Sequence, residues 1–255
     1  YENPFSTTSY EPGSTMKIYT YMCALETGLY DGDETFESGS ITIGEDTIND
    51  WNNKGWGKIT LDKGFEYSSN VGVVNLIQKY LNKEKLKDCF KKYGFGKKTN
   101  IEFTREVAGQ LNFNYEVEVA TAGFGQGIKT TVVQQLQAAS IVANDGHMIS
   151  PHIVKKIVDP NTNEITYESE VTKSEQLVKK STIEKIKELI VESLGIEEDQ
   201  VTMEASFKED LKVDSLDLFE MVMSLEDEFD VEIPTEELEK METVGDVVEY
   251  IKEHK

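Results

Sequence analysis

The stretch from Glu209 to Glu220 marks a change from a polar loop to an amphipathic helix. Ser215 lies where the first turn of that helix is expected, and this position favours a short polar side chain. Apolar residues then recur at helical spacing and predict one buried side, formed by Leu216, Phe219, Val222, Met223 and Phe229. Ser215 is therefore either an ordinary capping residue or an accessible hydroxyl at the start of an acidic helix.

The sequence around Ser215 resembles a bacterial acyl carrier protein from Ile183 to Lys255. The resemblance rests on an ordered set of motifs: Ile183-Glu-Lys-Ile-Lys-Glu-Leu-Ile, Leu194-Gly-Ile, Ala205-Ser-Phe-Lys-Glu-Asp-Leu, Asp214-Ser-Leu-Asp, Leu225-Glu-Asp-Glu-Phe, Glu232-Ile-Pro and Thr243-Val-Gly-Asp-Val-Val. In that family the serine of Asp-Ser-Leu carries 4′-phosphopantetheine, which comes from coenzyme A. The resemblance assigns this attachment to Ser215 and implies an all-α, four-helix acyl-carrier bundle with one short member.

The same resemblance implies what this part of the chain does. Carriers of this family hold growing acyl chains as thioesters on the phosphopantetheine arm in fatty acid biosynthesis. The partners would be a phosphopantetheinyl transferase and fatty acid synthesis enzymes with basic patches. We predict that these enzymes bind a docking face that consists of Asp214, Phe219, Glu220, Met223, Glu226 and Asp227. The acids of this face are also what an ordinary solvated helix face would carry.

The charge of the chain is unevenly spread and indicates two units with different partners. Among the 255 residues, 181–255 include 24 acidic and 7 basic ones, a net charge of −17, whereas the first 180 include 24 acidic and 19 basic ones, a net charge of −5. The acidic part should repel nucleic acid and anionic lipid, and attract proteins with basic surfaces. We expect no nucleic acid partner, no membrane segment and no signal peptide.

The cysteines and histidines indicate no special site. Cys23 and Cys89 are far apart in the sequence, and the three histidines are scattered. The sequence therefore predicts neither a disulfide framework nor a metal site. Because the chain starts with Tyr1 and not with methionine, we interpret it as a fragment or a processed chain.

Two short patterns in the first part contain residue types that suit nucleophilic catalysis. After the turn at Pro12-Gly13, a helix that starts near Ser14 places Lys17 on the same face. An amine at that distance can accept the serine proton and make the hydroxyl a nucleophile. Further on, Ser68 and Asn70 lie on one side of a tight turn. Each pattern alone is common and also fits an ordinary turn or helix start.

With their surroundings, these patterns resemble the transpeptidase domain of class B penicillin-binding proteins from Tyr10 to about Tyr167. The matching stretches are Tyr10-Glu-Pro-Gly-Ser-Thr-Met-Lys, Ala24-Leu-Glu-Thr-Gly, Tyr67-Ser-Ser-Asn-Val-Gly, Tyr93-Gly-Phe-Gly, Ala122-Gly-Phe-Gly-Gln-Gly-Ile and Asn144-Asp-Gly-His-Met-Ile-Ser-Pro-His-Ile-Val. The resemblance implies an α+β, penicillin-binding/β-lactamase-like domain in which Ser14 is acylated by a peptidoglycan stem peptide or a β-lactam. Lys17 would be the base, and Ser68 and Asn70 would line the site and help to pass the proton.

One departure from that family bears on activity. The third motif of the family, Lys-Thr-Gly, does not occur in the chain, and Lys129-Thr130-Thr131 is not its equivalent. That motif normally lies on a strand that holds the oxyanion and the substrate carboxylate. The chain leaves the family pattern between Ile165 and Leu189, so we expect a truncated domain without several central strands and with little or no transpeptidation.

We therefore expect three segments along the chain. Residues 1–170 form a partial penicillin-binding protein transpeptidase domain, 171–181 form a polar linker, and 182–255 form an acyl carrier protein domain. The sequence leaves the boundary between the two domains open, because residues 181–192 suit either family. If the segment is the first helix of the carrier domain, the side chains that face the core of that domain are those of Ile183, Ile186, Leu189, Ile190 and Leu194.

The remaining patterns predict individual elements. A helix is expected over 83–98 and another over 132–143, the latter with one side formed by Val133, Leu136, Ala139, Ser140 and Ala143. Two alternating runs around Pro160 predict a hairpin, and Thr243 should cap the last helix. Trp51 and Trp56 are interpreted as packing residues.

Two functions follow, in order of preference. The first is an acyl carrier that works through Ser215 and would be cytoplasmic. The second is a serine D,D-transpeptidase of peptidoglycan (cell wall) synthesis that acts through Ser14, inactive because the Lys-Thr-Gly strand is missing. Intact penicillin-binding proteins are membrane-anchored and face outward, but no anchor occurs here. A natural fusion, an engineered chimera and an assembly error would all give this sequence, and in each the halves need not act together.

Overall fold

The computed structural model describes residues 3–102 and 105–194, together with Ser206, Thr243, Asp246 and Tyr250. The chain divides into two compact units, Tyr1–Ser193 and Leu194–Lys255, which we call unit one and unit two. The helices in the described ranges are α1 (Pro4–Thr7), the 3₁₀ turn η1 (Gly13–Thr15), α2 (Met16–Glu26), α3 (Leu61–Glu66), α4 (Asn70–Tyr80), α5 (Lys83–Lys92), α6 (Glu116–Ala122), α7 (Val132–Ala143) and α8 (Lys180–Leu194).

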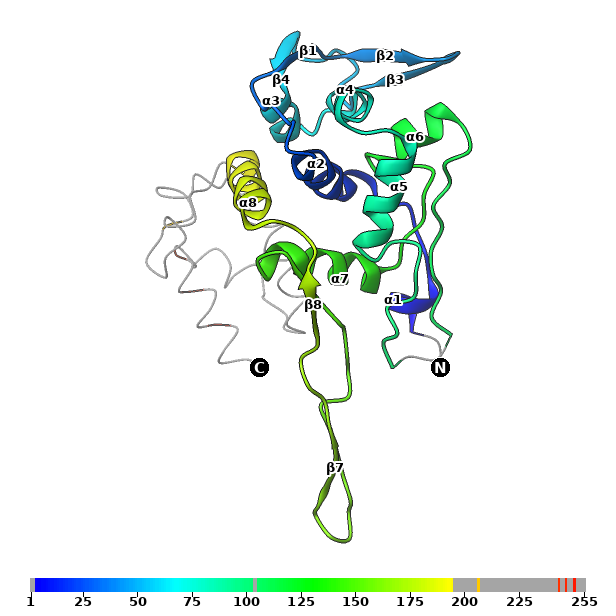
Figure 1. Cartoon of the computed structure of the whole chain (residues 1–255), viewed down its shortest axis with the longest axis vertical. Coiled ribbons are helices and arrows are strands. Elements are labelled where there is room, and N and C mark those ends of the chain that lie inside the picture. Colours follow the sequence, from blue (N-terminus) through cyan, green and yellow to red (C-terminus); the bar gives the residue numbers. More distant parts are fainter. Residues whose placement is uncertain are drawn as a thin grey trace. The chain divides into compact units, whose positions relative to one another are not determined.

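Short strands connect these helices and pair in antiparallel twos. The pairs are β1 (Thr35–Glu37) with β4 (Lys58–Thr60), β2 (Ser40–Ile43) with β3 (Asp46–Asn49), β5 (His147–Ile149) with β8 (Lys173–Gln176), and β6 (Lys156–Val158) with β7 (Ile165–Glu168). The β1–β4 and β2–β3 pairs lie beside α3 and α4, while the β6–β7 hairpin projects away from the helices (Figure 1).

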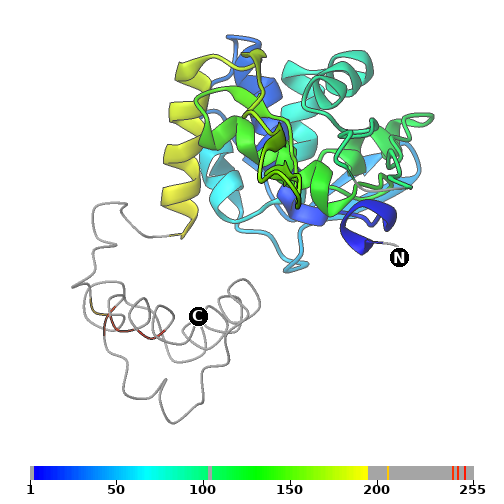
Figure 2. The same ribbon diagram turned by 90° about the horizontal axis from the view of Figure 1, so that it is seen from below.

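Helix α2 occupies the centre of unit one. Most of its residues are buried, including polar ones that side-chain hydrogen bonds satisfy. The hydroxyl of Thr20 donates to the carbonyl of Gly123 at 2.8 Å, and that of Tyr21 donates to the carbonyl of Leu61 at 2.9 Å. A helix buried on all sides needs such partners, because an unpaired buried polar group costs free energy. Helices α4, α5 and α8 surround it (Figures 1 and 2).

Local sequence sets where the surrounding helices begin. The hydroxyl of Ser69 accepts a hydrogen bond from the amide of Gly72 and so caps α4. At α7, Thr131 and Gln134 form a reciprocal capping box. Short polar side chains at these positions satisfy amides that have no partner inside the helix. Helix α5 ends at Lys92, earlier than the predicted 98, and the bounds of α7 match the prediction.

The side of α7 that the sequence analysis listed is not the buried side as a whole, although Val133 on it is buried. Leu136 is 65% exposed, whereas Gln134 and Gln137 are buried. The amide of Gln134 donates to the carbonyls of Lys97 and Ala108, at 2.5 and 2.8 Å, and so ties the 97–108 loop to the helix. A buried glutamine that bonds to loop carbonyls rotates the helix away from the side that its apolar residues alone would predict.

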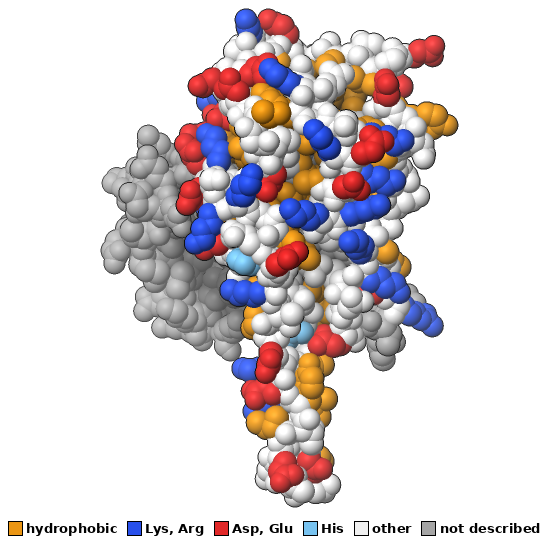
Figure 3. All heavy atoms as spheres, viewed as in Figure 1, with side chains coloured by type: hydrophobic (Ala, Val, Ile, Leu, Met, Phe, Trp, Pro, Cys, Tyr) orange, Lys and Arg blue, Asp and Glu red, His pale blue; other side chains and the backbone are white. Residues whose placement is uncertain are grey.

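The β6–β7 hairpin confirms the predicted pair of strands around Pro160. Every residue of both strands is exposed. Apolar side chains lie along the projecting hairpin, as the orange spheres in Figure 3 show, and they include Ile157, Val158, Ile165 and Tyr167.

Residues 171–181 differ from the predicted linker. They contain β8, which pairs with β5, and the first residues of α8. The buried side chains of Ile183, Ile186 and Leu189 belong to the hydrophobic core of unit one. The division between compact units therefore falls after Ser193, about one helix later than the sequence predicted.

The sequence predicted no disulfide framework, but the described part of the structure contains a disulfide. Cys23 on α2 and Cys89 on α5 form a disulfide, with their Cα atoms 6.1 Å apart. The two residues are separated by 66 positions, so nothing in their spacing indicated that they meet. The bond joins the central helix to its neighbour and closes a long loop.

Besides Leu194 at the end of α8, four residues of unit two are described: Ser206, Thr243, Asp246 and Tyr250. Ser206 and Thr243 form an isolated antiparallel bridge. The amide of Thr243 donates to the carboxylate of Asp246 at 2.8 Å, and the amide of Asp246 donates back to the hydroxyl of Thr243 at 3.3 Å. This reciprocal pair is the one that a helix cap forms, as predicted for Thr243, and Asp246 and Tyr250 are each helical. Apart from these residues and the first predicted helix, which is α8, the predicted four-helix bundle lies outside the described residues.

Two further observations concern the described ranges only. No helix in them is long and apolar enough to cross a membrane. Nor do they contain a group of three or more His, Cys, Asp and Glu side chains that could hold a metal ion.

We predict that the Cys23–Cys89 disulfide stabilises unit one. A loop of this length should contribute about 4 kcal/mol to the free energy of unfolding through the entropy of the unfolded chain. Both tryptophans, Trp51 and Trp56, lie in unit one, so urea unfolding followed by their fluorescence reports on this unit. A reducing agent should lower the urea midpoint of the natural chain. It should leave a Cys23→Ala, Cys89→Ala variant unchanged, and an unshifted midpoint in the natural chain would contradict the prediction.

Candidate functional site

The turn that carries Ser14 is held by a close approach of two glycines. Gly13 has a φ of +61°, and its amide donates to the carbonyl of Gly125 at 3.1 Å. A Cβ atom on Gly125 would lie 2.1 Å from the carbonyl oxygen of Gly13, so only glycine fits there. The Ser14 side chain is exposed at this turn, directly before α2.

Lys17 lies one turn further along and is buried, with 3% of its surface exposed. Its Nζ donates to the hydroxyl of Ser68 at 2.9 Å and also to the backbone carbonyl of Ser68. Burial lowers the pKa of Lys17 to about 8, and the negative charge of Asp50 offsets part of this effect. An amine with a pKa near neutrality can both accept and return a proton, which is what the proton transfer at a serine nucleophile requires.

Ser68 takes up a backbone conformation that few residues adopt, with a φ of 53°. The turn before α4 is fixed by the buried carboxylate of Asp50. One oxygen of Asp50 accepts hydrogen bonds from the hydroxyl of Ser69 at 2.8 Å and from the amide of Val71 at 3.0 Å. The other accepts from the amide of Gly39 at 2.8 Å. Asp50 thus connects the end of β3 to the turn that presents Ser68.

The structure brings together some of the predicted site residues. Lys17 and Ser68 are in direct hydrogen-bond contact although 51 positions separate them. Asn70 begins α4, and its side-chain amide donates to the carbonyl of Asn49 at 3.0 Å. Ser14 lies in η1, directly before α2, three residues before Lys17. The catalytic roles of these four residues stay predictions.

An aromatic cluster of Trp51, Trp56 and Tyr67 lies next to Ser68 in the chain, and the sequence did not predict it. Trp51 is 67% exposed, so the interpretation of Trp51 as a packing residue is wrong. Its ring lies edge-on to that of Trp56, which stacks on Tyr67 at 5.0 Å between centroids, and its Nε1 donates to the carbonyl of Tyr67. Tyr67 is the neighbour of Ser68. In the sequence, Trp51 directly follows Asp50, whose buried carboxylate fixes the turn before α4. This adjacency could have indicated that Trp51 lies near the site.

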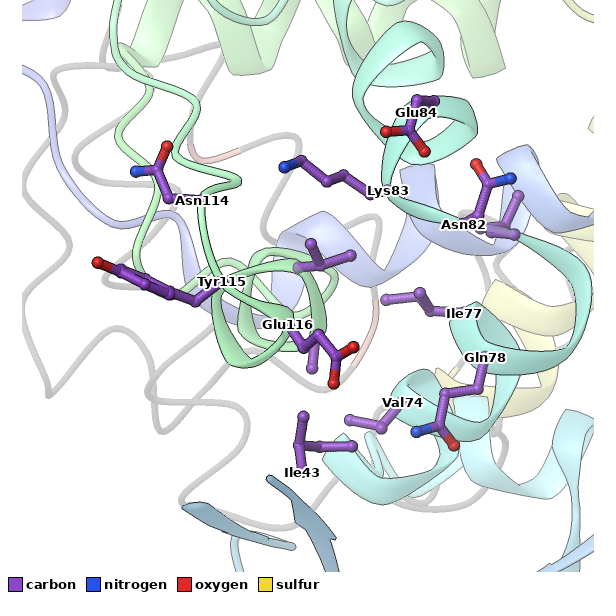
Figure 4. A pocket seen from close by; sticks show the side chains of 13 residues that line it. Ile43, Val74, Ile77, Gln78, Asn82, Lys83, Glu84, Asn114, Tyr115 and Glu116 are labelled. Carbon is purple, nitrogen blue, oxygen red and sulfur yellow. The ribbon is translucent and has the colours of Figure 1, made fainter. Parts of the chain in front are cut away.

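A separate cavity of about 520 Å³ opens between α4, α6 and the β2–β3 hairpin. Val74 and Ile77 on α4 line it, and Ile43 faces them from the hairpin (Figure 4). Polar side chains such as those of Lys83 and Asn114 lie at its rim. None of Ser14, Lys17, Ser68 and Asn70 lines this cavity.

The predicted attachment and docking residues of unit two lie outside the described residues. They are Ser215 with Asp214, Phe219, Glu220, Met223, Glu226 and Asp227. Their assignment therefore depends on the sequence and on the comparisons with known proteins.

Two family models match the chain. The penicillin binding protein transpeptidase domain matches residues 1–195, and the phosphopantetheine attachment site matches residues 184–251. An acyl carrier protein of Clostridium acetobutylicum is 55% identical over 71 residues, which are 28% of this chain and 92% of that protein. The chain joins a penicillin-binding protein transpeptidase domain to an acyl carrier protein. Covalently bound 4′-phosphopantetheine is the cofactor of the carrier part.

Further relatives match only the transpeptidase part. Stage V sporulation protein D of Bacillus subtilis is 35% identical over 185 residues, 70% of this chain but 28% of that protein. The crystal structure of penicillin binding protein 2X from Streptococcus thermophilus gives a TM-score of 0.70 with 29% identity, and covers 76% of this chain and 28% of that one. The chain thus spans little more than a quarter of these larger relatives. The two-domain fold class, with an α+β first part and a carrier-like second part, is confirmed.

We predict that Asp50 is required for the stability of the turn before α4. Asp50→Ala should lower the free energy of unfolding by about 3 kcal/mol, because it leaves several buried donors without an acceptor. Asp46→Ala, at an exposed position of the same hairpin, should change it by less than about 0.5 kcal/mol. Urea midpoints measured by tryptophan fluorescence check both values, and equal midpoints in the two variants would contradict the role of Asp50.

We also predict that Lys17 titrates near pH 8 in the folded chain, below its ordinary pKa of 10.5. Below pH 8 the folded state keeps a buried ammonium at a cost. As the pH rises from 8 to 10.5, the folded state releases this proton before the unfolded state does, so the contribution of Lys17 to stability rises. A ¹³Cε NMR titration, assigned with Lys17→Arg, measures the pKa. A midpoint equal to that of the urea-unfolded chain would contradict the prediction.

Proposed function

We propose that the chain is an acyl carrier that works through Ser215. A phosphopantetheinyl transferase joins the phosphate of the arm to the hydroxyl of Ser215, and the adenosine bisphosphate part of coenzyme A leaves. The observation that carries this proposal is the match of residues 184–251 to the phosphopantetheine attachment site, supported by a relative that aligns over nearly its full length. The capped helix at Thr243 and Asp246 agrees with a helical unit two.

Ser215 does no chemistry after the arm is attached. The thiol of the arm forms a thioester with an acyl group, and the flexible tether raises the concentration of that group at each partner enzyme. The net charge of −17 over residues 181–255 favours partners with basic patches. We infer that these are enzymes of fatty acid biosynthesis in the cytoplasm, and that they bind the face formed by Asp214, Phe219, Glu220, Met223, Glu226 and Asp227.

Intact-mass measurement tests the attachment. The purified chain, incubated with coenzyme A and a phosphopantetheinyl transferase, should gain the mass of one phosphopantetheine. Ser215→Ala should gain no mass. Ser206→Ala changes another serine of the same unit, one that bridges to Thr243, and should gain as much mass as the natural chain. If the natural chain gains no mass, or if Ser215→Ala still does, the carrier assignment is wrong.

A second function, β-lactam binding by unit one, is favoured by the contact between Lys17 and Ser68. In this reaction Ser14 Oγ bonds to the lactam carbonyl carbon and the lactam C–N bond opens. The hydroxyl proton passes by way of Lys17 and Ser68 to the lactam nitrogen. Neutral Lys17 is the form that accepts a proton, so acylation should increase as the pH rises through about 8.

We propose that this unit acylates slowly and does not complete transpeptidation of a stem peptide. The Lys-Thr-Gly motif that would hold the oxyanion and the substrate carboxylate does not occur in the sequence. Removal of one oxyanion donor alone typically lowers kcat by about 10²–10³.

Labelling with a fluorescent penicillin tests this second function. Slow labelling of the natural chain is expected, with loss of the label in Ser14→Ala and in Lys17→Ala. Ser9→Ala, at a nearby serine outside the predicted site, should label like the natural chain. Efficient transpeptidation of a D-Ala-D-Ala stem peptide would contradict the proposed inactivity, and labelling that persists in Ser14→Ala would exclude Ser14 as the nucleophile.

A further inference from the structure

The cavity between α4, α6 and the β2–β3 hairpin has an aliphatic floor. The floor is formed by Ile43, Val74, Ile77 and Val119. Each of these residues is at most 9% exposed and belongs to the hydrophobic core of unit one, so close packing holds the floor in place. The cavity therefore exists before any ligand binds, and its volume of about 520 Å³ is within the range of sites that bind small molecules.

The rim of this cavity carries charges of both signs. Lys83 and Glu84 lie at the start of α5, and Glu116 lies at the start of α6. All three side chains are exposed. Within the described ranges, the side chains of Lys83 and Glu116 make no hydrogen bond and no ion pair. Figure 4 shows them in different parts of the opening, so both charged groups are available to a ligand.

The three charges restrict the kind of ligand that fits. An anionic amphiphile could pair with Lys83, but the carboxylates of Glu84 and Glu116 would repel it. A cationic amphiphile would be attracted by these carboxylates and repelled by Lys83. A molecule with one charge of each sign and aliphatic groups between them complements both the rim and the floor.

We propose that this cavity binds a small zwitterionic ligand with an aliphatic body, of the size of an apolar dipeptide. The carboxylate of the ligand pairs with Lys83, its ammonium group pairs with Glu116, and its aliphatic groups contact the floor. The site is separate from the predicted acylation site, because none of the four residues predicted for acylation lines the cavity. It is also independent of the proposed carrier function.

Methyl NMR of the intact chain tests where such a ligand binds. The probe is L-leucyl-L-leucine, which is a zwitterion near neutral pH. The methyl signals of Ile43 and Ile77 should shift in a saturable way as the dipeptide is added, because both side chains line the cavity. The methyl signals of Ile141, which is buried on α7 and does not line the cavity, should not shift.

Dipeptides with one blocked end test the two charges separately. Lys83→Gln should weaken the binding of leucyl-leucine and of N-acetyl-leucyl-leucine, which keeps only the carboxylate, by about two- to fivefold, because exposed ion pairs contribute modestly. It should not weaken the binding of leucyl-leucine amide, which keeps only the ammonium group. Glu116→Gln should weaken the binding of leucyl-leucine and of the amide, and should not weaken that of the N-acetyl form.

Two matched variants control for the change in net charge. Lys85→Gln and Asp88→Asn each remove one charge from an exposed position of α5 that does not line the cavity. Both variants should bind all three dipeptides as tightly as the natural chain does, because neither residue belongs to the rim.

Each outcome decides the proposal. Saturable shifts at Ile43 and Ile77 with the expected dependence on the two charges support a zwitterion site in this cavity. No shift at either methyl group with any of the three dipeptides overturns it. If Lys83→Gln or Glu116→Gln binds leucyl-leucine as tightly as the natural chain, the proposal is also overturned, since the ligand is then not held at both ends.

Discussion

Burial of helix α2 is the constraint on which unit one depends. Three neighbouring elements are attached to this helix by a specific contact: α5 by the disulfide at Cys23, the turn before α4 by Lys17, and α8 by Glu26. The same burial creates the chemistry of the candidate site. Because Lys17 lies on a helix that is surrounded by protein, its ammonium is desolvated, and its pKa falls to about 8.

The carrier and the transpeptidase domain have different physical requirements. The disulfide between Cys23 and Cys89 persists in oxidising compartments, where penicillin-binding proteins act. Coenzyme A and the enzymes of fatty acid synthesis belong to the cytoplasm, where thiols are kept reduced. In that compartment a reduced unit one would be less stable. The redox state of the compartment therefore affects the stability of unit one through its disulfide.

Sequence patterns predicted pairs of residues that lie close together in the chain. They missed contacts between residues that are far apart in the chain. Ser14 and Lys17 are three positions apart, and the cap at Thr243 involves a residue three positions on, so both could be read from the chain. The disulfide joins positions far apart and needed the packing of α5 on α2. The exposure of Trp51 and the burial of Gln134 depend on hydrogen bonds to distant carbonyls, which no periodicity shows. The position of α8 was missed because its sequence matches both families.

The measurement that tests this account most directly is amide hydrogen exchange of residues 180–194 in the intact chain, with and without a reducing agent. The account predicts that α8 exchanges as part of unit one. Its amides should be protected together with those of α2, and reduction of the disulfide should speed exchange in both segments by a similar factor. If residues 180–194 instead exchange at the rate of residues 195–255 and do not respond to reduction, α8 belongs to the carrier alone and the account is wrong.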